Sequence, residues 1–495
     1  MTHVRTLIVG AGFSGIGMAV ALRDAGMDDF VVLEKAAAPG GTWRENTYPG
    51  CACDVPSAVY SFSFEPNPDW SHVYAHQPEI EAYLNRTVER RGLAGAIRFG
   101  TELLAAEWDE ADSLWRIETN RGAYTADVLI AGAGPLHQPV VPDLPGLDRF
   151  EGTVFHSAEW RHEHDLCGER VAVVGTGASA IQFVPRIQPT VGRMHLFQRT
   201  APWVLPKLDH RIGSLEKAVY RRIPGAQRTL RELLYHGFEL VQLAQRHPRA
   251  MQQLERIARL HLRRSVPDPE LREALTPSFV LGCKRILQSN DYYPAITADN
   301  VEVVTHPVRE LGANSVSAAD GIEREVDTII FGTGFHATDP PIAKRVRGRE
   351  GSSLEGVWHG SPQAYLGTTI AGFPNAFLVI GPNLGNGHSS AIVLIEAQAR
   401  YIVDALRTMD AERLATVEPR AEIQERWNRD VQEALAGTVW NAGGCSSYYL
   451  DANGRNSAIY PWTTLDLRRR LRSFDRDAFA TTSRADTRSR ATAAA

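Results

Sequence analysis

The apolar and polar positions near the N-terminus predict a strand, a tight turn, a helix and a second strand. Residues 5–10, RTLIVG, form a short apolar run that ends at glycine, which is typical of a strand buried in a parallel sheet. We expect a helix over 14–26 and a second strand over 30–34, FVVLE. This order of elements favours an α/β fold.

The turn between the first strand and the helix reads G-A-G-F-S-G, with its glycines at GxGxxG spacing. Glycines there let the backbone approach a pyrophosphate, and the helix N-terminus attracts its negative charge. The second strand ends in Glu34, 24 residues after Gly10, where a carboxylate can accept hydrogen bonds from a ribose. The pattern therefore predicts a dinucleotide site formed by Gly10, Gly12, Phe13, Ser14, Gly15, Glu34 and Lys35.

A second stretch repeats this pattern, with a strand over 170–175, a helix to about 188 and a strand over 193–198. Here the second strand is followed by Arg199, again 24 residues after the first glycine of the loop. A carboxylate suits a free ribose diol, whereas a guanidinium can bind the 2′-phosphate of NADP, so we expect FAD or NAD in the first site and NADPH in the second. The alternative is that Arg199 is a solvated surface residue. The predicted residues of the second site are Gly175, Thr176, Gly177, Ala178, Ser179, Ala180, Arg199 and Thr200.

Length, charge and cysteine content limit the number of domains and the kinds of partner that we expect. A length of 495 residues suggests roughly three domain-sized units, and a net charge of −5 gives no reason to expect nucleic acid or an anionic membrane as a partner. The five cysteines show neither a disulfide framework nor a metal-binding spacing, which favours a cytoplasmic location and no metal. The apolar run over 7–22 is glycine-rich and too short for a membrane span or a signal peptide, and we expect neither.

Two further motifs give the chain a resemblance to the Baeyer–Villiger monooxygenases. Residues 150–160 read FEGTVFHSAEW, in which Phe150, Gly152, His156 and Trp160 fit the family fingerprint FxGxxxHxxxW. Residues 40–54 read GGTWRENTYPGCACD and fit the second family pattern, GGxWxxxx(Y/F)PGxxxD. One departure is Arg161, where the family usually has proline or aspartate. The resemblance also includes residues 282–293, 381–398 and 443–462, so it covers nearly the whole chain.

The resemblance implies two Rossmann-like dinucleotide-binding domains, one for FAD and one for NADPH, with a helical insertion. Residues 127–134, DVLIAGAG, and 327–335, DTIIFGTGF, resemble the strands that carry the chain between such domains. We expect the charged face of the insertion to be solvated, with a membrane-surface role as the alternative. The expected boundaries are 1–140 with 380–478 for the FAD domain, 155–210 with 277–340 for the NADPH domain, 211–276 for the insertion and 479–495 for a disordered tail.

The chemistry that the resemblance implies is the insertion of one oxygen atom of O₂ into a ketone, giving an ester or a lactone. NADPH reduces FAD, O₂ adds at flavin C4a, and the resulting peroxide attacks the carbonyl. An arginine suits this chemistry because it holds a positive charge at any working pH. By resemblance the catalytic arginine is Arg285, which also lies at the cofactors, and its carboxylate partner is Asp54; a purely structural salt bridge is the alternative. The resemblance adds Gly41, Thr42, Trp43, Asp54, Tyr60 and Leu103 to the FAD site and Lys284 to the NADPH site.

Some roles remain open at the level of sequence. The resemblance assigns His156 to the coupling of the two domains, with packing or general-base catalysis as alternatives. Trp160 is equally well explained as a packing residue, and His388 in GNGHSS is expected near the flavin. The rival functions are oxygenation of sulfides or amines by the same peroxide, a flavin disulfide reductase that needs a cysteine pair beside FAD, and a binding protein with inactive sites.

Overall fold

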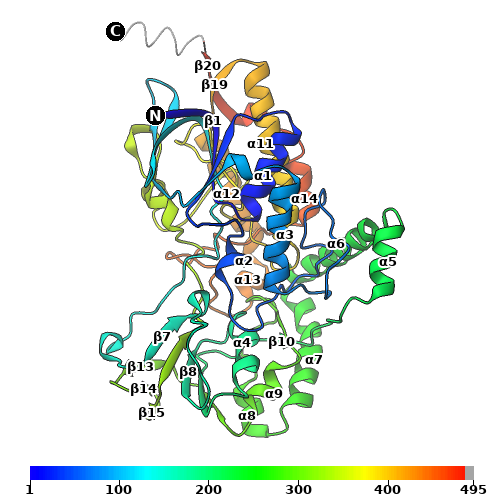
Figure 1. Cartoon of the computed structure of the whole chain (residues 1–495), viewed down its shortest axis with the longest axis vertical. Helices are drawn as coiled ribbons and strands as arrows, with labels where there is room; N and C mark the ends of the chain where they lie inside the picture. The colour runs from blue at the N-terminus through cyan, green and yellow to red at the C-terminus, as the bar shows by residue number, and fades with distance from the viewer. Residues whose placement is uncertain (485–495) are drawn as a thin grey trace.

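Two separate sheets, one above the other in Figure 1, form the frame of the molecule; the upper one is mixed, because β5 pairs antiparallel with β4 and β6, and the lower one is parallel. The computed structural model describes residues 1–484. The upper sheet has the strand order β17-β4-β5-β6-β1-β2-β3, with β18 paired to β6. Its strands are β1 (Thr2–Val9), β2 (Phe30–Glu34), β3 (Ile97–Phe99), β4 (Leu103–Asp109), β5 (Leu114–Thr119), β6 (Gly122–Ala131), β17 (Val346–Arg347) and β18 (Ala376–Leu378).

The upper sheet confirms the first strand–turn–helix–strand pattern. Helix α1 (Phe13–Asp24) follows β1 and packs on α11 (Ala391–Ala411), while β2 pairs in parallel with β1. The chain returns to this sheet at β17, earlier than the expected residue 380. The other helices from the segments that build the upper sheet and from the C-terminal residues are α2 (Thr42–Glu45), α3 (Gln77–Arg90), α10 (Leu354–Trp358), α12 (Ala421–Ala436), α13 (Val439–Ala442) and α14 (Thr464–Arg470).

The lower sheet confirms the second pattern and is parallel throughout, in the order β12-β9-β8-β16-β7. Helices α4 (Ala180–Ile187) and α9 (Tyr292–Ile296) pack against each other beside it. Its strands are β7 (Thr153–His156), β8 (Arg170–Val174), β9 (Arg193–Phe197), β12 (Val301–Val304) and β16 (Thr328–Phe331). Smaller sheets pair β10 (Val204–Leu205) with β11 (Leu287–Gln288), and β14 (Ser315–Ala318) with β13 (Val308–Leu311) and β15 (Glu323–Glu325).

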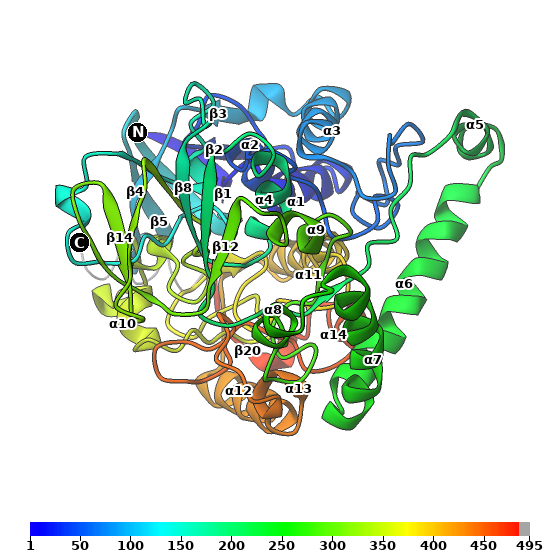
Figure 2. The ribbon, with the colours of Figure 1, turned by 90° about the horizontal axis from the view of Figure 1, so that it is seen from below.

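Residues 211–276 are helical. They form α5 (Ser214–Arg222), α6 (Ala226–Gln245), α7 (Pro248–Ser265) and α8 (Pro269–Ala274), and α6 leads away from the sheets towards α5 (Figure 2). The charged face expected of this segment is exposed on α7, where it is formed by Arg256, Arg259, Arg263 and Arg264. On α6, by contrast, the polar Glu239, Gln242 and Gln245 are buried, whereas Leu233 and Leu240 are 67% and 68% exposed.

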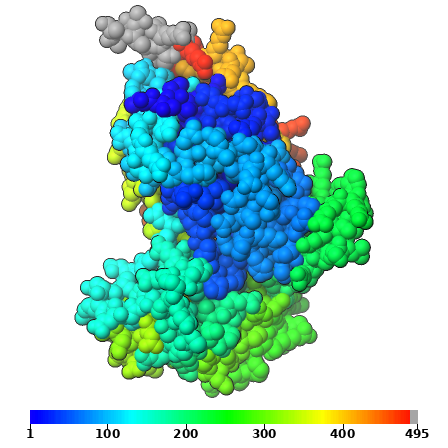
Figure 3. Space-filling model, in the orientation of Figure 1, coloured from blue at the N-terminus to red at the C-terminus, as the bar shows by residue number. Residues whose placement is uncertain are grey.

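The insertion also contacts the N-terminal residues, which it borders in Figure 3 as the green surface beside the blue one. Arg231 of α6 donates hydrogen bonds to the backbone carbonyls of Ala58, Val59 and Ser61. None of the helices within residues 1–484 is long and apolar enough to cross a membrane.

The end of the chain corrects another expectation. Residues predicted to begin a disordered tail form β20 (Phe479–Ser483), which pairs antiparallel with β19 (Leu414–Pro419). Phe479 is fully buried, and this burial explains why the segment is ordered. The rest of the predicted tail, residues 485–495, lies outside the described residues.

Candidate active site

The first glycine loop connects β1 to α1, and its backbone packs too closely for larger residues. A Cβ atom on Gly10 would lie 2.8 Å from the carbonyl oxygen of Gly132, and Gly10 has φ of 96°. A Cβ atom on Gly15 would lie 1.8 Å from the carbonyl oxygen of Gly10. Glycine is therefore required at position 15 by the close packing of the loop on the helix, and at position 10 by the turn after β6 and the positive φ.

A cavity of about 280 Å³ opens beside this loop. A Cβ on Gly12 would meet nothing within 4 Å except the backbone of Gly41, so the loop is open where a pyrophosphate would lie. Gly15 lies behind the loop and does not line the cavity. The predicted residues that do line it are Gly10, Gly12, Phe13, Ser14, Glu34, Lys35, Gly41, Thr42, Trp43, Tyr60 and Leu103.

Side chains around this cavity are held by hydrogen bonds. The carboxylate of Glu34 accepts from the backbone N–H groups of Ala11 at 2.8 Å and Ala36 at 2.9 Å. The indole N–H of Trp43 donates to the hydroxyl of Tyr60 at 2.9 Å. A fixed carboxylate at the end of β2 and an open glycine loop fit the adenosine and pyrophosphate parts of FAD. Sequence reasoning missed the other wall of the cavity, which is formed by Arg44, Pro135, Leu136, His137, Gln138, Pro340 and Ile342; its only signal was the proline-rich stretch that follows β6.

The second glycine loop, between β8 and α4, repeats this geometry. A Cβ on Gly175 would lie 2.5 Å from the carbonyl oxygen of Gly332, whereas one on Gly177 would be 3.9 Å from that atom and otherwise free. Helix α4 begins at Ala180, and the hydroxyl of Thr176 donates to the backbone carbonyl of Thr200 at 3.4 Å. Ala178 and Ser179 complete the loop between Gly177 and the start of α4 at Ala180. The loop leaves the approach to the helix N-terminus open, which fits a second dinucleotide.

Two cations mark the far end of this second site. Arg199 is exposed directly after β9, and neither it nor Lys284 has a carboxylate partner among the described residues. Burial lowers the pKa of the Lys284 ammonium, and the charge of Arg199 lowers it further. Cations of this kind can bind a phosphate group.

An ion pair between Asp54 and Arg285 lies between the two sites. The guanidinium donates to the two carboxylate oxygens from Nε at 2.5 Å and from Nη2 at 2.6 Å, and Nη1 reaches the backbone carbonyl of Asn386 at 3.5 Å. Burial acts to raise the pKa of Asp54, but the charge and hydrogen bonds of Arg285 outweigh it and the pKa is lowered. The charge of Asp54 in turn raises the pKa of Arg285 well above its ordinary value. Arg285 therefore carries a fixed positive charge, held by Asp54 at Nε and Nη2 and, in a longer contact, by Asn386 at Nη1.

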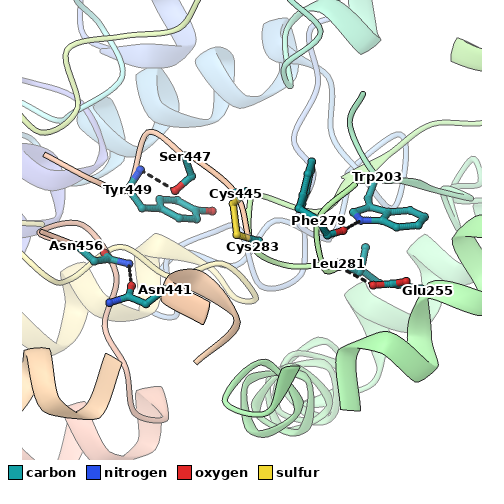
Figure 4. The surroundings of a disulfide bond; sticks show 10 residues. All are labelled: Trp203, Glu255, Phe279, Leu281, Cys283, Asn441, Cys445, Ser447, Tyr449 and Asn456. Atoms are coloured by element: carbon teal, nitrogen blue, oxygen red, sulfur yellow. Dashed lines mark hydrogen bonds between the residues drawn. A yellow bond between two sulfur atoms is a disulfide. The ribbon is translucent and has the colours of Figure 1, made fainter. Parts of the chain in front are cut away.

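A disulfide between Cys283 and Cys445 lies two residues from Arg285 and overturns the expectation from the cysteine count (Figure 4). The two cysteines are 162 residues apart, so no local spacing could reveal the pair. The C-A-C pair that could serve a disulfide reductase is instead buried and unbonded. Burial raises the pKa of the Cys51 thiol to about 12 and raises that of Cys53 as well, so neither is a reactive thiolate.

The fingerprint residues lie on and around β7 in the lower sheet. A Cβ on Gly152 would be 2.3 Å from the carbonyl oxygen of Asp327 and 2.6 Å from the ring of Phe150, so only glycine fits. His156 is 1% exposed, and its Nδ1 accepts from the backbone N–H of Ala158. Trp160 packs edge-on against Phe155. Arg161, the departure from the family pattern, is exposed.

His156 sits against the glycine turn that follows β16. Its ring lies 5.6 Å from that of Phe335, and its side chain interacts with the backbone of Gly334. Burial lowers the pKa of His156 to about 4, so the imidazole is neutral at working pH. Its second nitrogen, Nε2, has no partner within the described residues.

His388 is also buried, at 9% exposure, and its Nε2 lies 3.7 Å from the carboxylate of Glu239 on α6. Asn386, two residues before it, contacts Arg285 through its carbonyl. The GNGHSS segment thus lies beside Arg285 at one end and against α6 at His388. Across residues 1–484 no group of three or more histidine, cysteine or carboxylate side chains is arranged to hold a metal ion.

The fold and these sites define a flavoprotein oxidoreductase with two dinucleotide-binding sheets and a fixed arginine between them. A family model described as pyridine nucleotide-disulphide oxidoreductase matches residues 7–233. A Baeyer-Villiger monooxygenase of Streptomyces coelicolor is 50% identical over 475 residues, which cover 96% of this chain and 92% of that protein. One of Pseudomonas aeruginosa is 48% identical over 486 residues, covering 96% and 91%.

Solved structures agree with these relatives. Cyclohexanone monooxygenase from Rhodococcus sp. Phi1 bound to NADP⁺ superposes with a TM-score of 0.85 at 30% identity, covering 97% of this chain and 99% of that one. The complex of OTEMO with FAD and NADP gives a TM-score of 0.87 at 25% identity, covering 97% and 99%. The chain belongs to the Baeyer–Villiger monooxygenase family, NADPH-dependent flavoproteins that convert ketones to esters or lactones.

Proposed function

We propose that Arg285 is the catalytic cation of this Baeyer–Villiger monooxygenase and that Asp54 holds it in place. The observation that carries the proposal is the paired hydrogen bond between the two side chains, which fixes the guanidinium through Nε and Nη2 and leaves Nη1 with only a long contact. FAD reduced by NADPH supplies the activation of O₂, and the protein supplies orientation and charge. Arg285 is placed to stabilise the negative charge that develops on the oxygen of a ketone carbonyl as it is attacked.

We assign the two dinucleotides to the two sheets by their strand-end residues. Glu34, held by backbone N–H groups, suits the ribose diol of FAD, and the cavity beside Gly12 suits the rest of that cofactor. Arg199 and Lys284 suit the 2′-phosphate of NADPH, with the Gly175 loop at its pyrophosphate. In this assignment residues 1–140 and the C-terminal part form the FAD domain, and residues 155–340 with their helical insertion form the NADPH domain.

His156 serves in this proposal as a link between the fingerprint and the NADPH domain. A buried, neutral imidazole that caps residues 157–159 and packs against the turn after β16 suits a coupling role better than a general base. The reacting partners are O₂ and a small ketone.

The test compares flavin reduction with oxygenated product. Arg285→Ala should be reduced by NADPH under anaerobic conditions at a rate within about tenfold of the unchanged enzyme, yet form at least about 100-fold less ester in air. Arg263→Ala, an exposed arginine on α7, is the matched control and should behave as the unchanged enzyme. Ester formation retained in Arg285→Ala would reject the assignment, and a thioether assayed beside the ketones distinguishes sulfide oxygenation.

A further inference from the structure

A second cavity, of about 690 Å³, lies between the helical insertion and the N-terminal residues, in the region where the green surface borders the blue one in Figure 3. Its walls come from residues 58–66, from the end of α5 with the turn into α6, and from α11 and α14. Small-molecule sites usually have volumes of about 300–1,000 Å³. Within residues 1–484 this cavity shares no lining residue with the cavity beside Gly12, and neither Asp54 nor Arg285 lines it. It is therefore separate from the site described above.

One part of the wall of this second cavity is apolar. Phe62, Val393 and Leu471 line the cavity and are buried beneath it. Ile223, which follows α5, also lines it and is 54% exposed. An exposed apolar side chain beside a buried apolar wall gains free energy when the apolar part of a ligand covers it.

The rest of the wall is rich in cations. Five arginines line the cavity against two carboxylates: Arg221, Arg228, Arg231, Arg400 and Arg468 against Glu232 and Glu396. Two of the arginines are engaged, because Arg221 pairs with Asp69 and Arg231 donates to backbone carbonyls. Glu396 is engaged as well, since it accepts from the backbone N–H of Ser63 at 2.6 Å and lies 3.9 Å from Arg231.

The other three arginines have no such partner. Arg228, Arg400 and Arg468 are exposed, and none of them has a carboxylate within 4 Å in the part of the chain over 1–484. They come from three different helices, α6, α11 and α14. The guanidinium of Arg468 lies 5.3 Å from the centre of the Tyr235 ring, which holds it at the cavity wall. The cavity thus has an excess of positive charge that the protein does not neutralise.

We propose that this cavity binds a carboxylic acid with an apolar chain, with its carboxylate among the three unpartnered arginines and its chain on the apolar wall. Guanidinium groups bind carboxylates through paired, charge-assisted hydrogen bonds. A carboxylate fits better than a phosphate, because the two glutamates in the wall repel a doubly charged group more strongly than a singly charged one. The site adds to the oxygenation of ketones and does not depend on the role of Arg285.

Calorimetric titration of the FAD-loaded enzyme with decanoate tests the ligand class. Decanoate should bind at least about 30-fold more tightly than butanoate, because the longer chain buries more apolar area. It should also bind at least about tenfold more tightly than decanol, which has the chain without the charge. If butanoate or inorganic phosphate binds as tightly as decanoate, the apolar wall takes no part and the proposal fails.

Matched variants test the location of the charge. The triple substitution Arg228→Gln, Arg400→Gln and Arg468→Gln should weaken decanoate binding at least about tenfold. Its control is Arg256→Gln, Arg263→Gln and Arg264→Gln, which removes the same charge from exposed arginines of α7 outside the cavity and should leave the affinity unchanged. Equal affinity of the two triple variants would overturn the proposal.

Single exposed positions complete the test without disturbing the helix contacts. Ile223→Asp places a like charge beside the apolar wall and should weaken decanoate binding at least about tenfold. Ile257→Asp is its control, because Ile257 is 52% exposed on α7 and does not line the cavity. Arg285→Ala should bind decanoate as tightly as the unchanged enzyme. A loss of affinity in Arg285→Ala, or none in Ile223→Asp, would place the probe elsewhere and refute the site.

Discussion

The carboxylate of Asp54 and the guanidinium of Arg285 are joined by paired hydrogen bonds of 2.5 and 2.6 Å, although 231 residues separate them in the chain. Asp54 follows the GGxW motif of the FAD side, whereas Arg285 follows the insertion of the NADPH side. This ion pair therefore joins two segments that are far apart in the chain.

Replacing Asp54 by asparagine should weaken both the fold and the reaction. The partly buried Arg285 would lose its counter-charge, which we expect to cost about 2–3 kcal/mol of unfolding free energy. Because the folded pKa of Asp54 is lowered, its stabilisation is complete above the unfolded pKa near 3.9 and is lost as pH falls through the folded value. Thermal unfolding midpoints at pH 7 and in acid check this. Asp54→Asn should have a lower midpoint than the unchanged protein at pH 7. Between pH 7 and acid its midpoint should fall by less than that of the unchanged protein. An unchanged midpoint at pH 7 would contradict a stabilising ion pair.

Arg199 should decide which nicotinamide cofactor is used. Arg199→Ala removes a guanidinium that is exposed beside Lys284 and has no carboxylate partner in the described residues. Loss of a charged hydrogen bond of about 1.5–3 kcal/mol should raise KM for NADPH about 10- to 100-fold and leave that for NADH unchanged. Steady-state kinetics with the two cofactors measure this directly. Equal effects on both cofactors would show that Arg199 does not contact the 2′-phosphate.

The use of NADPH should weaken at high pH because of Lys284. Burial and Arg199 lower the pKa of its ammonium from the ordinary 10.5, so the group loses its proton at a lower pH than a free lysine. As pH rises through that value the attraction for the phosphate falls, and KM for NADPH should rise. Lys284→Met should have a high KM that no longer changes with pH, while KM for NADH serves as the pH control in both proteins. If KM for NADPH still rises at alkaline pH in Lys284→Met, the effect belongs to another group.

Gly152 should be essential for stability rather than for chemistry. A methyl group there would lie 2.3 Å from the carbonyl oxygen of Asp327 and would push β7 away from β16. We expect Gly152→Ala to cost about 1–3 kcal/mol, measured as a lower thermal midpoint with FAD bound. Gly237→Ala is the control, since it lies on α6 with open space around it and should stabilise the helix by about 1 kcal/mol. Equal midpoints for the two variants would refute the steric argument.

The residues of the cofactor loops could be predicted from local sequence. Gly15 packs on the backbone of Gly10 within one strand–turn–helix unit, and Glu34 ends the next strand, so spacing alone predicted these positions. Spacing also predicted Gly175 and Arg199 in the second unit. The backbone neighbours of Gly10 and Gly175, Gly132 and Gly332, come from distant segments that the spacing does not reveal. The pairing of Asp54 with Arg285 was reached only through the family resemblance, because nothing local connects residues so far apart.

Three features of the structure could not be predicted from neighbouring residues in the sequence. The cysteine count argued against a disulfide, yet Cys283 and Cys445 are bonded because two distant segments pack together. The helical pattern of residues 226–245 correctly predicted α6 but not which face is buried, since Glu239 and Gln242 bind the segment near Thr464 and Trp462. The polar composition of residues 479–483 predicted disorder, but pairing with β19 orders them.

The sequence by itself determined the two dinucleotide-binding units, since strand, glycine loop, helix and strand-end charge follow one another within a short stretch of chain. Only the tertiary structure decided how these units meet. Asp54, Arg285 and Cys445 come from three distant segments, and their approach depends on the packing of whole sheets and helices. The strand-end motifs therefore predict the cofactors, while the packing between the two sheets determines which side chains surround the reacting oxygen.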